Sequence, residues 1–376
     1  MSMRTAQDGW RTLRLKLLPD RVICCALVGY APPAERISIE CRFFPTGMTG
    51  MTIGDLIRLL SDGEYHSGEQ LGEQLGVSRT AVWKQLKKLE KIGLQLEAVK
   101  GQGYRLAAPL DLLSGPAIIE RLPAEPRHHL TRLFVEDALP STNTFLRERF
   151  QQGAGHAEVC LAESQDAGRG RRGRHWVCPW GSGLLFSLGW RFDEGASALE
   201  GLSLAVGVVL AEVLERLSVP VVLKWPNDLL LRRGDGTAKL AGILLEVSGD
   251  VAGPCEVVIG IGLNVSLPDA ARNSVEQPVA ALNDVRSDIT RNELSASLVE
   301  ALLGMLPLFE QYGFEPWRDA WNRRNAYEGL EVDVVQGERT YTAVAEGVDA
   351  TGNLQVNVNG EVRLLAGGEI SLRARS

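Results

Sequence analysis

The chain has 376 residues, of which 45% are hydrophobic and 23% are charged, a composition typical of a soluble protein with two or three domains. Its net charge of -7 excludes a protein that coats nucleic acid with its whole surface, so any contact with DNA must be local. The six cysteines form no C-x-x-C pair and the longest apolar run near the N-terminus, residues 22–31, is too short to span a bilayer, which favours a cytoplasmic protein with no membrane partner.

Residues 1–50 differ in character from the rest of the chain. They contain three of the six cysteines and the pair Pro32-Pro33, and they sustain neither a helical nor a strand period. An amphipathic pattern begins only after Met51. We therefore expect residues 1–50 to be a non-native or disordered N-terminal extension, with Met48 or Met51 as the true start.

Residues 51–112 are predicted to form a winged helix-turn-helix domain. A first helix is expected over residues 52–60, a second after the capping residue Ser67, and a third after the capping residue Ser78. Two short strands within residues 96–106 then form a hairpin that serves as the wing.

The third helix is the candidate reader of the major groove of DNA. Between residues 79 and 105 there are seven Lys or Arg against two Glu, so positive charge is concentrated where DNA would lie. The alternative is a small protein-interaction domain whose lysines are only solvated. The predicted DNA contacts are Ser78, Arg79, Thr80, Trp83, Lys84, Lys87 and Lys100.

Residues 113–324 contain strand-like and helix-like segments that do not strictly alternate, which predicts an α+β domain. Strands are expected at residues 133–136, 159–163, 184–190, 221–224, 240–247 and 256–263, and helices at residues 142–151, 199–217 and 293–312.

The segment G-R-G-R-R-G-R-H-W, residues 168–176, combines four arginines with three glycines. Glycines allow a backbone to approach a ligand closely, and guanidinium groups pair with phosphate or carboxylate oxygens. The spacing also fits a dinucleotide-binding G-x-G-x-x-G, but the Pro and Gly residues that follow do not allow the helix this motif requires. The segment could also be a solvated surface turn or a contact with nucleic acid. We expect a loop that binds a nucleotide or an acyl phosphate.

Further polar clusters fall at the predicted strand ends, and each is weak evidence alone. Ser141 could be merely a helix cap, and Lys239 could be a solvent-facing lysine at a strand edge. Near the C-terminus, residues 325–376 contain short strands separated by turns such as Asn359-Gly360, which predicts a small SH3-like barrel.

Taken together, the ordered motifs S-T-N, E-x-Q-x-A-G-R-G-R-R-G-R-x-W, K-W-P-N-D, K-x-A-G-I-L-x-E and I-G-I-G-x-N resemble those of bacterial biotin protein ligases. Residues 51–106 are similar to the DNA-binding domain of the bifunctional members, which also repress the biotin operon. The resemblance implies a multidomain α+β fold. Its parts are the winged helix-turn-helix at residues 51–112, a biotin/lipoate ligase-type catalytic domain of the class II synthetase kind at residues 113–324, and an SH3-like C-terminal domain at residues 325–376.

The resemblance also implies the chemistry and the partners. Biotin and ATP, with Mg²⁺, form biotinyl-5'-AMP, and the biotinyl group then passes to a lysine of the biotin carboxyl carrier protein of acetyl-CoA carboxylase. The adenylate would act as co-repressor, favouring a homodimer that binds operator DNA of the biotin operon. A lipoate-type ligase, a ligand-sensing regulator without ligase activity, and an enzyme that has lost repression are the competing functional hypotheses.

Residue roles follow from the same resemblance, motif by motif. The biotin contacts are Ser141, Thr142, Asn143, Gln165, Arg169, Gly170, Arg171 and Lys239, of which Arg169, Arg171 and Lys239 are the catalytic set. The adenylate contacts are Trp176, Asn227, Asp228 and Asn264, with Asp228 the weaker candidate near magnesium. Two positions depart from the family pattern. His175 replaces a frequent lysine, and Val279 stands where many relatives have a tryptophan near the adenine.

Overall fold

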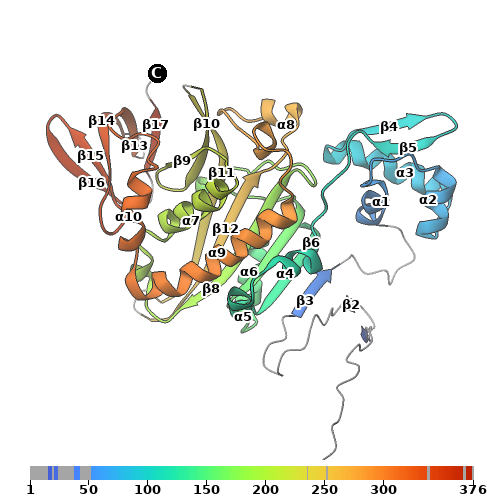
Figure 1. Ribbon diagram of the computed structural model, residues 1–376, viewed down its shortest axis with the longest axis horizontal. Coiled ribbons are helices and arrows are strands. Elements are labelled where there is room, and N and C mark those ends of the chain that lie inside the picture. The colour runs from blue at the N-terminus through green and yellow to red at the C-terminus, as the bar shows by residue number, and fades with distance from the viewer. Residues whose placement is uncertain are drawn as a thin grey trace, which may run out of the picture.

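The computed structural model describes residues 52–374 except 235, 251–252, 337–338 and 367–369, together with the backbone of Lys16–Leu18, Arg21–Ile23 and Ser38–Arg42. Three parts follow one another along the molecule. The winged-helix domain and the C-terminal sheet lie at opposite ends of a central α/β domain (Figure 1). The predicted multidomain α+β fold is confirmed.

The described parts of the N-terminal segment are three short strands. Strands β1 (Lys16–Leu18) and β2 (Arg21–Ile23) pair with each other, and β3 (Ser38–Arg42) pairs in parallel with β6 (Arg132–Leu139) of the central sheet. The rest of residues 1–51 lies outside the described residues. The expectation that residues 1–50 form a non-native or disordered extension therefore stays a prediction.

The winged-helix domain forms because its three helices begin at strong caps. Thr52, Ser67 and Ser78 each accept a hydrogen bond from the backbone N–H three residues later. The third helix is shorter than its apolar pattern suggests, because it ends at Leu89 and a 3-10 turn at Glu90–Ile92 follows. The elements are α1 (Ile53–Leu60), α2 (Gly68–Leu75), α3 (Arg79–Leu89), β4 (Leu96–Val99) and β5 (Gly103–Leu106).

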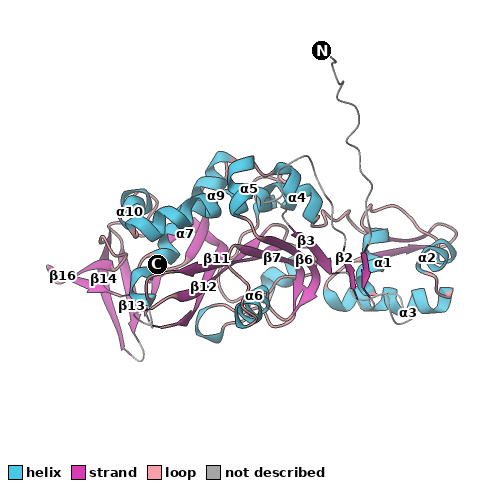
Figure 2. Cartoon of the chain, turned by 90° about the horizontal axis from the view of Figure 1, so that it is seen from below, coloured by secondary structure: helices cyan, strands magenta, loops and turns pink. Residues whose placement is uncertain are grey.

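The central domain is built on one mixed sheet with the strand order β3-β6-β7-β8-β12-β11-β10-β9. Helices α7 and α9 cover one face together with α4 and α5, while α6 covers the other (Figure 2). The strands are β7 (Glu158–Gln165), β8 (Gly183–Phe192), β9 (Val221–Lys224), β10 (Asp228–Arg233), β11 (Gly236–Gly249) and β12 (Cys255–Asn264). The helices are α4 (Gly115–Arg121), α5 (Ala124–His129), α6 (Thr142–Gln151), α7 (Leu202–Arg216), α8 (Asp269–Asn273) and α9 (Arg291–Tyr312).

The C-terminal part is a small antiparallel sheet with the strand order β16-β15-β14-β13-β17, which agrees with an SH3-like module. It is fastened to the central domain by the buried indole of Trp225, whose Nε1 donates a hydrogen bond to the carbonyl of Gly352 at 3.1 Å. Its strands are β13 (Glu331–Gln336), β14 (Arg339–Val348), β15 (Leu354–Val358), β16 (Glu361–Leu365) and β17 (Ile370–Ala374). Helix α10 (Glu315–Asn322) of the central domain packs against both α7 and β14. Among the described residues, no helix has the length and apolar character needed to cross a membrane.

Candidate active site

A cavity of about 1070 Å³ lies in the central domain, and its wall contains all of the residues predicted to bind biotin and adenylate. The helix α6, the arginine loop at residues 168–176 and the strand pair β11–β12 contribute most of that wall. His175 and Val279 line it as well. The structure therefore brings together motifs that are separated by more than a hundred residues in the chain.

One end of the cavity is a buried polar cluster at the start of α6. The side-chain Oε1 of Gln165 accepts hydrogen bonds from the backbone N–H and the hydroxyl of Thr142, at 2.6 and 3.0 Å. The hydroxyl of Ser187 lies 2.7 Å from Thr142 Oγ1 and 2.6 Å from Asn143 Oδ1. Ser141 is both the cap of α6 and part of the cavity wall, so its two predicted roles coexist. This end can hydrogen-bond a small, neutral polar group.

Glycines on the strands make room for this cluster. An added Cβ on Gly260 would lie 2.3 Å from Asn143 Oδ1, and one on Gly262 would lie 2.5 Å from a ring carbon of Trp176. Both distances are well inside van der Waals contact, so these positions accept no larger side chain without movement. Gly242 pairs with Gly262 across β11 and β12 and also lies against the Trp176 ring.

The arginine loop is a tight turn. The N–H of Gly170 donates to the carbonyl of Arg174 at 2.7 Å, and Arg172 and Gly173 both have a positive φ, of 59° and 69°. A left-handed conformation at a non-glycine residue is uncommon, and the glycine beside it lets the turn close. The turn places Arg169 beside α6, where it donates to Thr144 Oγ1 at 3.0 Å and lies 3.4 Å from Glu246 Oε1.

Arg171 points from the same loop toward the K-W-P-N-D segment. Its guanidinium donates to Asn227 Oδ1 at 3.4 Å, and Asn227 Nδ2 in turn donates to the carbonyl of Ile243 at 2.7 Å. Burial, reinforced by the charge of Arg172, lowers the pKa of Arg171. A guanidinium keeps its proton despite such a shift, so Arg171 is a half-buried positive charge at the cavity wall.

Lys239 occupies the middle of the cavity. Its Nζ is 2.7 Å from Asp228 Oδ1 and 5.6 Å from the centre of the Trp176 ring. The buried Nε1–H of Trp176 has no hydrogen-bond partner within the described part of the chain, so this donor is available to a ligand. The Asp228 carboxylate neutralises the charge of Lys239, and an anionic ligand could take the place of that carboxylate.

The order of these groups follows β12. Side chains two residues apart point to the same face of a strand. Gly260 therefore lies under the polar cluster and Gly262 lies under Trp176, while its partner Gly242 on β11 lies against both Trp176 and Lys239; Asn264 lies beyond them. The cavity runs from a neutral polar end, past an ammonium group, to a second end.

That second end is closed by the loop that follows β12. The backbone N–H of Lys239 donates to Pro278 O at 2.9 Å, and Ala280 donates back to Lys239 O at 2.8 Å, so the segment carrying Val279 lies beside the lysine. Asn264 Nδ2 donates to Ala280 O at 3.0 Å. A side chain near this end, Asp284, holds the loop. Burial alone would raise its pKa, but hydrogen bonds from Arg272 and the Ala281 N–H outweigh burial and lower it.

Several residues of the site escaped the sequence-based prediction. Ser187 and Glu246 hold Asn143 from two sides, with Glu246 Oε2 accepting from Asn143 Nδ2 at 2.8 Å. Glu246 is the final residue of the K-x-A-G-I-L-x-E motif, so the sequence could have identified it as a site residue. Ser187 lies in no motif. Tyr327 reaches the cavity from the start of the C-terminal part.

No activated nucleophile is evident beside the arginine loop among the described residues. The nearest thiol is that of Cys178, and burial raises its pKa to about 11, so it is a neutral thiol near pH 7. In the described residues no three His, Cys, Asp or Glu side chains gather as a metal site requires. The cavity is thus equipped to bind and to stabilise negative charge.

The winged-helix domain presents a separate candidate surface. All of its predicted DNA contacts are exposed: Ser78, Arg79, Thr80, Trp83, Lys84, Lys87 and Lys100. Trp83 is 46% exposed, which is unusual for tryptophan, and the Lys87 Nζ lies 3.8 Å from its ring centre. An exposed aromatic and several cations on one helix are suited to a nucleic acid.

Comparison with known families supports both parts of this description. A model of the biotin/lipoate A/B protein ligase family matches residues 135–264, an HTH domain model matches residues 54–105, and a biotin protein ligase C terminal domain model matches residues 329–373. The first match covers the polar cluster, the arginine loop and Lys239.

Curated relatives and solved structures agree. The bifunctional ligase/repressor BirA of Escherichia coli K12 is 38% identical over 320 residues, which cover 85% of this chain and 96% of the relative. BirA of Bacillus subtilis is 29% identical over 85% of this chain and 98% of the relative. The biotin protein ligase of Aquifex aeolicus in complex with biotin and ATP superposes with a TM-score of 0.55 at 26% identity, covering 65% of this chain and 99% of that chain. This chain therefore belongs to the biotin protein ligases, in the group of bifunctional ligase/repressors.

Proposed function

We propose that the chain activates biotin with ATP, transfers it to the biotin carboxyl carrier protein, and represses the biotin operon. The position of Lys239 carries the catalytic part of this proposal. It lies between the polar end of the cavity, which suits the ureido group of biotin, and the end near Asn264, which suits a nucleotide. An ammonium at that position would face the site where a carboxylate and a phosphate meet.

In the first step, an oxygen of the biotin carboxylate attacks the α-phosphorus of ATP. A new O–P bond forms, the bond to the β-phosphate oxygen breaks, and pyrophosphate leaves. Negative charge builds on the phosphate oxygens, and fixed cations in a half-buried site stabilise such charge better than water does. We assign this role to Lys239 and Arg171, with Arg169 closing over the phosphate after leaving Glu246.

Magnesium would enter with ATP. The residues present fit that mode of binding, because Mg²⁺ usually takes phosphate oxygens and water plus one or two carboxylates. Asp228 is the candidate carboxylate at the cavity wall. When bound, the ion would neutralise phosphate charge.

In the second step, the neutral amine of the carrier lysine attacks the acyl carbon of the adenylate. The amide bond forms, the C–O bond to AMP breaks, and the amine loses a proton. The test uses the purified chain with biotin, Mg-ATP and a biotin carboxyl carrier domain, followed by the intact mass of the carrier. One added biotinyl group is expected. Addition of lipoate instead would indicate the sister activity, and no addition would favour a regulator without ligase activity.

The repressor part rests on the basic face of the winged-helix domain. Replacing Arg79 by Ala should weaken binding to a biotin-operon duplex and lower the slope of log K against log salt by about 1, because each phosphate contact releases about one counterion. Arg363→Ala, an exposed arginine of the C-terminal sheet, is the matched control. Fluorescence anisotropy over a salt series measures both. An unchanged slope for Arg79→Ala would remove this residue from the DNA contacts.

We propose further that the adenylate-bound form is a homodimer joined at a sheet edge of the central domain. Strand β6 bears on this proposal because only the five-residue β3 lies outside it in the described sheet. If the chain starts at Met48 or Met51, β6 itself becomes an edge with unpaired backbone groups, which invite strand pairing. Analytical ultracentrifugation of chains 1–376 and 51–376, with and without biotin and ATP, tests this. A monomer under all conditions would contradict it.

A further inference from the structure

The winged-helix domain and the ligase domain share a hydrophobic core through one side chain of the ligase domain. Trp180 is 4% exposed and packs in the cluster formed by Leu56, Leu60 and other apolar residues of the winged helix. It lies only four residues after Trp176, in the segment that joins the arginine loop to β8. A single short segment thus connects the adenylate site to the DNA-binding domain.

The segment around Trp180 is held on both sides. Pro179 lies against Gly93, which follows the 3-10 turn after α3 of the winged-helix domain, and an added Cβ on that glycine would be 3.3 Å from the proline. The N–H of Gly181 donates to Glu163 O at 3.0 Å, and the Ser182 hydroxyl donates to Pro179 O at 2.7 Å. The turn is therefore positioned by ligase residues while its indole is buried in the other domain.

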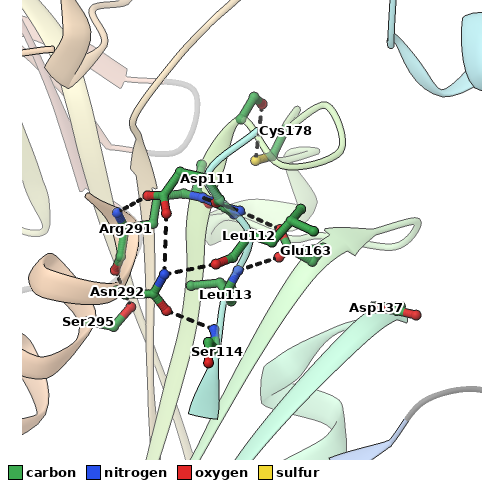
Figure 3. Close-up of polar contacts among 12 residues, drawn as sticks. Asp111, Leu112, Leu113, Ser114, Asp137, Glu163, Cys178, Arg291, Asn292 and Ser295 are labelled. Carbon is green, nitrogen blue, oxygen red and sulfur yellow. Dashed lines mark hydrogen bonds and ion pairs between the residues drawn. The ribbon is translucent and has the colours of Figure 1, made fainter. Parts of the chain in front are cut away.

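The linker between the domains is clamped at the same place (Figure 3). The carboxylate of Glu163 accepts from the Leu113 N–H at 2.7 Å and pairs with the buried Arg291 at 2.7 Å. Arg291 Nε donates to Asp111 O at 2.8 Å, and Asn292 Nδ2 donates to Leu112 O at 2.8 Å. Backbone groups fixed by buried side chains leave the linker little freedom.

A second interdomain contact lies away from the arginine loop. The guanidinium of Arg58 in α1 pairs with both carboxylate oxygens of Asp137 in β6. Planar, two-point pairing fixes orientation as well as distance. The winged-helix domain is therefore held against the ligase domain in a fixed orientation. Of the two contacts, only that of Trp180 is in the segment that continues into the arginine loop.

We propose that Trp180 is a positioning residue that couples the arginine loop to the winged-helix domain. When the loop closes over the adenylate, its C-terminal end would carry the indole with it, so the state of the site biases the placement of the DNA-binding domain. Coupling of this kind is reciprocal, because a docked winged helix would also hold the loop closed. The inference rests on the proposed adenylate chemistry only for the identity of the ligand.

The test compares full-length Trp180→Ala and Trp180→Phe with the wild type. Trp190→Phe is the control, because Trp190 is 5% exposed in the ligase core and absent from the winged-helix cluster. We expect adenylate to dissociate about 10-fold faster from Trp180→Ala, within the usual range of coupling energies, and at an intermediate rate from Trp180→Phe, whose ring is smaller than the indole. Trp190→Phe should leave the rate unchanged.

Hydrogen exchange distinguishes coupling from a purely structural role of Trp180, because a structural role would not change how α1 responds to ligand. Biotin and Mg-ATP should slow exchange in residues 168–176 and in α1 of the wild type. In Trp180→Ala the loop should still respond and α1 should not. Trp180→Phe decides the question if the alanine variant does not fold, because its smaller ring should weaken the response of α1 without removing it. An equal response of α1 in the wild type and the folded variants would overturn the proposal.

Failure of the proposed function would look different. If the wild type forms no adenylate from biotin and Mg-ATP, the ligase proposal fails. Hydrogen exchange of the ligand-free wild type and variants then still tests the role of Trp180. Faster exchange of residues 168–176 in Trp180→Phe than in the wild type and Trp190→Phe would support the coupling, and equal exchange would refute it.

Discussion

Replacing Lys239 by Gln is expected to lower kcat/KM for adenylate formation by about 10² to 10³-fold, the usual effect of removing one group that stabilises transition-state charge. The side chain stays polar but is one atom shorter, and it loses the charge beside Trp176 and Asp228. Pyrophosphate release at fixed biotin and varied ATP measures the change. We expect most of the loss in kcat, because the charge is needed most while the O–P bond forms.

Lys91→Gln is the matched control for this variant. Lys91 is an exposed lysine of the winged-helix domain, so its replacement changes the net charge by the same amount far from the cavity. It should retain full ligase activity. If Lys239→Gln raised the KM for ATP and left kcat intact, Lys239 would be a ground-state binding residue, and its assigned catalytic role would be wrong.

Gly260→Ala is expected to raise the KM for biotin by more than about 100-fold, because the added methyl group would displace side chains that form the biotin pocket. Its Cβ would lie 2.3 Å from Asn143 Oδ1. Asn143 cannot move away freely, because Ser187 and Glu246 hold its two amide atoms at 2.6 and 2.8 Å. Titration with biotin in a calorimeter separates this effect from any change in chemistry.

Gly304→Ala is the control for an added methyl group. Gly304 lies in α9 with open space around its Cα, and alanine is the better helix former by about 1 kcal/mol. The variant should bind biotin normally and melt at a slightly higher temperature. Normal biotin affinity in Gly260→Ala would show that the polar cluster does not receive the ligand.

Long periodic segments were predictable from the sequence because a sustained pattern outweighs local exceptions. The helix α6 and the strand β9 have the predicted bounds, and α9 begins only two residues early. Strand β10 was missed because its apolar stretch is only the three leucines at residues 229–231, too short for a period to be visible. The short helices α4 and α5 span only two turns or fewer, too few for a period to be visible.

The candidate site shows the same division. Charged and amide side chains stand out within motifs, and all of those predicted line one cavity. Ser187 could not be found in this way, because it reaches Asn143 only through the pairing of β8 with β12, where it stands opposite Gly260. The importance of Gly260 likewise depends on which side chain faces it. Register and tertiary contact decide such roles, and neither is readable from spacing along the chain.

The indole of Trp225 has a consequence for how this protein can evolve. It belongs to the motif that forms one wall of the cavity, yet its hydrogen-bond acceptor is a carbonyl of the C-terminal sheet. Removal of that sheet would expose the large apolar ring of Trp225 and leave its N–H without a hydrogen-bond acceptor. It would also remove the strands next to Tyr327, which lines the cavity. Ligase core and C-terminal sheet therefore depend on each other. Loss of the winged helix would remove no residue of the cavity wall in the described structure, but it would expose the indole of Trp180 next to the arginine loop.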